Sequence, residues 1–131
     1  MFVDASALTA MLAEESDGVE LIARMEQSAV KITSPIAVWE ATVALARISS
    51  RSVQDTGSQV ERFLDLANVQ VMPIPSGARV FALDAFDRFA KGRHPAALNM
   101  GDCFAYACAR HYNQPLMFKG GDFPLTDIEA A

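Results

Sequence analysis

The sequence begins Met1-Phe2-Val3-Asp4-Ala5-Ser6-Ala7-Leu8, a stretch in which one carboxylate interrupts an apolar run. Phe2-Val3 predicts a short buried strand, and Ser6 is a candidate cap for the helix that the following residues predict. An ionised carboxylate beside a core is unfavourable unless it is hydrogen-bonded, paired or bound to a cation. We therefore expect a compensating group beside Asp4.

Outward from this stretch, the chain alternates between helical and strand patterns. Helices are predicted after Ser6, from about Asp17 to Ala29, from Ser34 to about Ile48, around Val60 to Ala67, from about Ser76 to Phe89, and from about Gly101 to Tyr112. Further strands are predicted at Val30–Ile32, Val69–Met72 and Leu116–Phe118, with a last short strand near Asp127-Ile128. In the second helix, Val19, Ile22 and Ala23 are expected to face inward. The alternation predicts an α/β fold with a central, mostly parallel sheet covered on both faces by helices.

Length and composition place limits on the class of protein. The 131 residues are expected to form a single domain, 1–131, and the 51% hydrophobic content is ample for a core. No apolar run approaches the roughly 20 residues of a membrane span, and no signal peptide is evident, so a cytoplasmic protein is expected. The net charge of −5 argues against a protein that coats nucleic acid, although a local basic patch could still hold RNA. Cys103 and Cys108 point to different sides of one predicted helix, which favours a packing role over a disulfide.

Four acidic residues occupy informative positions. Asp4 follows the first strand and Asp122 follows the strand near Leu116, so both are expected at the carboxyl edge of the sheet. Asp102 lies at a helix N-terminus, which normally faces the same edge. Glu40 shares a helix face with apolar residues and is expected to point partly inward. The topology therefore brings three of the four acids together.

Each acid also has a purely structural interpretation. Asp102 could stabilise its helix as a cap or through the helix dipole, by about 0.5–2 kcal/mol. Asp122, after Gly120-Gly121, could be a turn residue, and Glu40 could be a surface glutamate. Asp4 is the hardest to explain by structure alone.

A cluster of carboxylates predicts a bound cation or retained protons. Two like charges 4 Å apart repel by about 4 kcal/mol at an effective dielectric constant of 20. Oxygen-only ligands select hard ions, so Mg²⁺, or Mn²⁺, is expected rather than zinc. His94 and His111 are too scattered for a zinc motif, and no P-loop, GxGxxG or GxSxG motif is present.

Several segments together resemble a known family. They are Val3–Ala7, Trp39-Glu40, the long run Arg93-His94-Pro95-Ala96-Ala97-Leu98-Asn99-Met100-Gly101-Asp102-Cys103-Phe104-Ala105-Tyr106-Ala107, Pro115–Phe123 and Thr126–Ile128. In these segments the chain resembles the VapC-type toxins of the PIN-domain family, along essentially its whole length. The resemblance implies a PIN-like three-layer sandwich.

The resemblance also implies a function. Members of the family are Mg²⁺-dependent ribonucleases, usually silenced by a VapB antitoxin, and a homodimer is expected. The family's acidic quartet falls on Asp4, Glu40, Asp102 and Asp122, of which the Asp122 position is the least uniform, and its small hydroxyl residue falls on Ser6. Apolar residues on the early helices would form the antitoxin groove, and an antitoxin arginine could enter the acidic pocket.

The expected reaction is metal-assisted hydrolysis of an RNA phosphodiester. Asp4, Asp102 and Asp122 would hold the metal, and Glu40 would be a further ligand or orient the attacking water. Candidate RNA-binding cations are Arg88, Lys91, Arg93 and Lys119, although the first three could simply form a solvated helix end.

Two other interpretations stay open at this stage. A catalytically idle PIN-like module would act only by binding a partner, and a Mg²⁺-dependent phosphatase or DNA nuclease would use much the same acids. The sequence does not fix which RNA is cleaved, or whether one or two ions are used.

Overall fold

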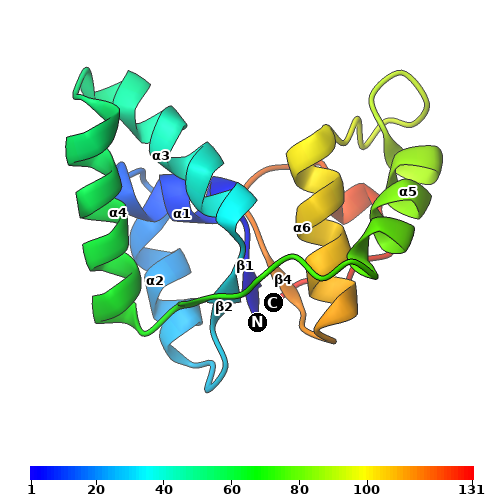
Figure 1. The fold of residues 1–131 in the computed structure, drawn as a ribbon, viewed down its shortest axis with the longest axis horizontal. Helices are drawn as coiled ribbons and strands as arrows, with labels where there is room; N and C mark the ends of the chain where they lie inside the picture. Colours follow the sequence, from blue (N-terminus) through cyan, green and yellow to red (C-terminus); the bar gives the residue numbers. More distant parts are fainter.

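A computed structural model describes residues 1–131. The strands are β1 (Phe2–Val3), β2 (Ile32–Thr33), β3 (Gln70–Val71) and β4 (Leu116–Met117). The helices are α1 (Ala5–Leu12), α2 (Gly18–Glu26), α3 (Pro35–Ser49), α4 (Val53–Ala67), α5 (Ala78–Phe89) and α6 (Met100–His111), followed by the 3₁₀ helix η1 (Phe123–Leu125). Figure 1 shows α1 to α4 gathered on one side of the sheet and α5 with α6 on the other.

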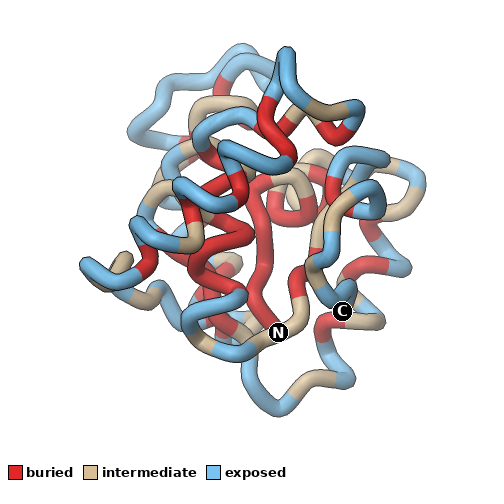
Figure 2. Tube along the Cα trace, turned by 90° about the vertical axis from the view of Figure 1, so that its right-hand side faces the viewer, coloured by how far each residue is buried: buried red, intermediate tan, exposed pale blue.

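The four short strands form one parallel sheet in the order β3-β2-β1-β4. Phe2 pairs with Ile32 on one side and with Leu116 on the other, so β1 is a central strand. Figure 2 shows this N-terminal segment running buried through the middle of the molecule. The predicted parallel sheet between two helical layers is confirmed.

Alternation along the strands separates the two halves of the core. Phe2 packs with Leu116 and Tyr106 in the cluster beneath α5 and α6. Val3 packs with Met117 in the larger cluster beneath α1 to α4. Because successive strand residues point to opposite faces, a strand of two residues suffices to join both halves.

Side-chain caps fix where several helices begin. Ser34 accepts a hydrogen bond from the backbone N–H of Ala37 (3.2 Å), and Pro35 occupies the first position of α3, as the sequence predicted. The predicted cap of the first helix was wrong, because Asp4 and not Ser6 is the N-cap of α1. The Asp4 carboxylate reaches the N–H of Ser6 directly, which begins the helix earlier than expected.

The inward face of the second helix was predicted correctly at Ile22, which packs against the core, and wrongly at Val19 and Ala23, which are exposed. Leu21 and Met25 are buried, whereas Val19 is 79% exposed. This short helix carries apolar residues on two adjacent faces, and the face with the larger Leu21 and Met25 side chains enters the core.

The last predicted strand, near Asp127-Ile128, is absent. The hydroxyl of Thr126 accepts from the N–H of Ile128 (3.3 Å), so the chain forms a local turn here instead of a strand. The chain pairs with Leu116 only as an isolated bridge at Ala130. None of the helices combines the length and apolar character needed to cross a membrane.

Candidate active site

Asp4 is the most buried acid of the candidate site, with 3% of its surface exposed. It follows β1, where its N–H donates to the carbonyl of Met117 (2.9 Å), so β4 holds its backbone in place. Its Oδ2 accepts from the N–H and the hydroxyl of Ser6. Burial raises the pKa of Asp4, and the hydrogen bonds from Ser6 only partly oppose this increase.

Ser6 connects Asp4 to the segment that follows β4. Its hydroxyl donates to Asp4 and accepts from the backbone N–H of Lys119 (3.0 Å). The Lys119 side chain turns away to pair with Glu15 and Asp17. The predicted position of Ser6 beside the acids is therefore observed, and it acts there as the support of Asp4.

Glu40 projects from the second turn of α3 toward the start of α6, where its carboxylate lies directly over Gly101. Burial raises the pKa of Glu40 to about 6, and the negative charges of Asp4 and Asp102 contribute further. The prediction that this glutamate points partly inward is confirmed. The adjacent Trp39 faces solvent, with 64% of its surface exposed.

Asp102 occupies the first turn of α6 and stabilises the start of that helix. Its Oδ2 accepts from the N–H of Asn99 (2.9 Å), while the Asn99 side chain accepts from the N–H of Asp102 (3.1 Å), which makes a reciprocal capping box. Burial raises the pKa of Asp102 to about 6; the bond from Asn99 opposes this, and the charges of Asp4 and Asp122 add to it. One carboxylate oxygen caps the helix, and the other takes no part in that cap.

Asp122 lies beyond β4 in an exposed turn, immediately before η1. Its negative charge contributes to the raised pKa of Asp102, but its side chain does not cap the 3₁₀ helix η1. The structure therefore brings Asp4, Glu40 and Asp102 together closely, with Asp122 at the margin of the group.

The donor set fits a hard divalent cation in kind, because it consists of carboxylate oxygens. None of the four acids forms an ion pair, so no side-chain cation compensates them. As the side chains stand, however, no three acidic, histidine or cysteine residues are arranged so that they could hold a metal ion. Binding a cation would require the carboxylates to draw together.

Three of the four candidate RNA-binding cations already have carboxylate partners. Arg88 pairs with Asp84 and Asp127, and Arg93 pairs with Asp87 at 3.0 Å. Lys119 is bound by two acids, as described above. Lys91 has no carboxylate partner and is exposed in the loop between α5 and α6.

The sequence interpretation missed two residues of this site, Asn99 and Gly101. The spacing Asn99-x-x-Asp102 is that of a capping box and could have indicated the first. No sequence signal indicated that the side chain of Glu40 would lie over Gly101, since the two are far apart in the chain.

Comparison with known proteins identifies the family. The family model of the PIN domain matches residues 1–129. The ribonuclease VapC of Mycolicibacterium smegmatis is 37% identical over 130 residues, covering 99% of this chain and 98% of that protein. The ribonuclease VapC30 of Mycobacterium tuberculosis is 36% identical over 128 residues, covering 98% of this chain and 95% of that protein. The chain belongs to the VapC group of the PIN-domain family.

A solved structure supports the fold. Mycobacterium tuberculosis VapC20, described as a toxin that cleaves the sarcin-ricin loop, superposes with a TM-score of 0.76 over 99% of this chain and 97% of that one. The sequence identity is 16%, so this likeness concerns the fold alone.

The raised pKa values predict how stability depends on pH. Because the folded-state pKa of Glu40 exceeds its unfolded value, ionisation of Glu40 destabilises the metal-free protein as pH rises from about 4.5 through about 6. Glu40→Gln removes this charge at nearly constant volume. Thermal unfolding in a chelator should show a higher Tm for the variant at about pH 7.5 and little difference at about pH 4.5.

Glu26→Gln is the matched control for this measurement, since Glu26 is exposed on α2, away from the other acids. Its Tm should follow that of the parent protein at both pH values. An equal or lower Tm for Glu40→Gln at neutral pH would contradict the destabilisation of the ionised Glu40 by burial and by the neighbouring charges.

Proposed function

We propose that this protein is a Mg²⁺-dependent endoribonuclease and the toxin of a VapBC-type toxin–antitoxin pair. The observation that carries the proposal is the group of three carboxylates, Asp4, Glu40 and Asp102, brought together from three separate elements without a cationic partner. A protein that only binds a partner gains nothing from the repulsion among these carboxylates, whereas a cation-dependent hydrolase requires the carboxylates as metal ligands. The ribonuclease names of the relatives agree with this activity.

The surroundings of each acid indicate its role in the proposed reaction. Asp4 and Asp102 each have one oxygen held by the protein, so the other is free to bind Mg²⁺, or Mn²⁺, in a defined direction. Asp122 would complete the shell from the margin. Glu40 would bind the ion or orient a water molecule and accept its proton. The bound ion would polarise the scissile phosphate and lower the pKa of the attacking water.

Asp4→Asn tests the activity directly. The amide keeps the volume and can still accept from the N–H of Ser6, so the fold and α1 should survive. Loss of the buried negative charge should reduce Mg²⁺-dependent cleavage of total RNA by at least about 100-fold, roughly 3 kcal/mol. Cleavage is measured on purified protein freed of antitoxin, with and without Mg²⁺ or Mn²⁺.

Asp65→Asn, an exposed change on α4, controls for contaminating nuclease and for handling. Undiminished cleavage by folded Asp4→Asn protein would refute the mechanism. A folded parent protein that cleaves no RNA with either metal would favour the catalytically idle binding module. Competition by DNA or small phosphomonoesters would favour the other hydrolase classes.

Among the candidate cations, Lys91 is best placed to contact RNA. Its ammonium has no carboxylate partner, whereas Arg88, Arg93 and Lys119 would have to exchange theirs. It lies in the loop that leads into α6, which carries Asp102.

Lys91→Ala should therefore weaken RNA binding more than Arg93→Ala does, and reduce the slope of log affinity against log salt by about one. The measurement is a salt titration of RNA binding in the Asp4→Asn background, which prevents cleavage. Equal salt slopes for the parent and Lys91→Ala would exclude a phosphate contact.

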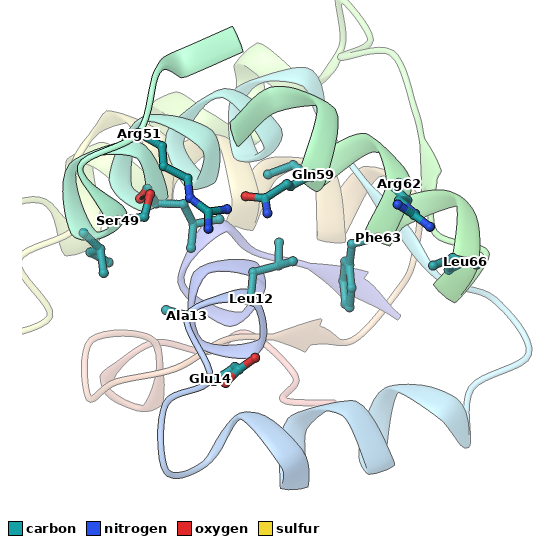
Figure 3. Close-up of a pocket in the computed structure, with 12 residues that line it drawn as sticks. Leu12, Ala13, Glu14, Ser49, Arg51, Gln59, Arg62, Phe63 and Leu66 are labelled. Atoms are coloured by element: carbon teal, nitrogen blue, oxygen red, sulfur yellow. Dashed lines mark hydrogen bonds between the residues drawn. The ribbon is translucent and has the colours of Figure 1, made fainter. Parts of the chain in front are cut away.

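The antitoxin would bind a groove between α1, α3 and α4. The groove has a volume of about 570 Å³, and Leu12 and Phe63 form part of its apolar lining. Figure 3 shows these two side chains facing the groove, with Arg51 and Arg62 toward its opposite ends. Apolar walls with terminal cations suit an amphipathic antitoxin segment that carries carboxylates.

Leu66 is 80% exposed at this groove, so Leu66→Glu should leave RNA cleavage intact and weaken antitoxin binding by at least about tenfold. Co-expression with the antitoxin followed by affinity measurement tests this. Val19→Glu, a change on α2 at a side chain that is 79% exposed and lies outside this groove, is the control, and equal effects of the two would place the antitoxin elsewhere. The expected homodimer remains a proposal, supported by a second apolar groove between α5 and α6.

A further inference from the structure

Gly101 is a buried residue in the first turn of α6, immediately before Asp102. A Cβ atom built on its backbone would lie well under 3.0 Å from both carboxylate oxygens of Glu40, a separation that real Cβ atoms do not show. The carboxylate of Glu40 therefore occupies the space that any other residue at position 101 would fill.

The backbone of Gly101 gives no other reason for glycine. Positive φ angles occur at Gly92 and Gly120, whereas Gly101 has none and continues the helix. Glycine is among the poorest helix formers, so alanine would favour α6 at this position. Gly57, in the middle of α4, contrasts with it, because a Cβ there would only touch Thr42 at 3.9 Å.

We propose that Gly101 is a positioning residue whose missing side chain lets the Glu40 carboxylate lie against α6, between Asp4 and Asp102. This inference rests on the proposed nuclease function, because it assigns Gly101 a role through Glu40. It also explains how a glutamate on α3 reaches acids that belong to β1 and α6.

The surroundings determine which group would yield to a new methyl. The capping box with Asn99 holds the start of α6, and the fully buried Tyr106 anchors the helix in the core. The Glu40 side chain has three rotatable bonds and can swing outward. Gly101→Ala should therefore displace the carboxylate and leave the helix where it is.

The experiment compares the parent protein with Gly101→Ala, Glu40→Asp and the double variant. Gly101→Ala should keep or raise the Tm, lower Mg²⁺-dependent kcat roughly 10- to 100-fold through misplacement, and weaken the binding of Mn²⁺ alone. Glu40→Asp shortens the side chain by one methylene and makes room for the new methyl. In the Glu40→Asp background, Gly101→Ala should then change kcat less than threefold, a non-additivity that a merely structural role would not produce.

Gly57→Ala is the matched control and should raise the Tm without changing kcat or Mn²⁺ affinity. A crystal structure of Gly101→Ala gives a readout that is independent of activity, and it should show the Glu40 carboxylate displaced over an unmoved α6. A shifted α6 with the carboxylate in place, or unchanged kcat and Mn²⁺ affinity in an active protein, would overturn the positioning role. An inactive parent protein would instead refute the proposed nuclease, and the crystal structure would still decide the placement of Glu40.

Discussion

The carboxylate of Asp4 is subject to two opposing demands, and the rest of the site depends on how they are met. As the N-cap of α1 it must remain an acceptor for the N–H of Ser6, which favours the charged form. As a buried group beside Glu40 and Asp102 it is driven toward the neutral form. A cation would relieve the repulsion and leave the cap intact.

The sheet fixes the position of Asp4 beside the other acids. β1 is a central strand of only two residues, yet it anchors both halves of the core through Phe2 and Val3. A parallel sheet collects the ends of its strands at one edge, so Asp4, the start of α3 and the segment after β4 meet there. The packing that forms the core therefore also holds the acids together against their mutual repulsion.

Much of this arrangement could be predicted from the sequence, because it depends on patterns of short range. The alternation of strands and helices gave the layers, and the Ser34-Pro35 pair gave the start of α3. The errors arose where two local solutions compete, as at Val19, where tertiary packing selects one of two apolar faces. Ser6 was predicted to cap the first helix in place of Asp4 because both residue types are good caps, and only the backbone geometry distinguishes them. The approach of Glu40 to Gly101 depends on how α3 crosses α6, which no local pattern encodes.

We propose that Asp4 and Asp102 bind a divalent cation together. The most direct test is a crystal structure of the antitoxin-free protein grown with Mn²⁺, with the ion located by anomalous scattering. We expect one or more ions bound by oxygens of both aspartates, with Glu40 in contact directly or through water. Full Mn²⁺-dependent cleavage in solution, together with a crystal in which these carboxylates hold no ion, would refute a shared cation at Asp4 and Asp102.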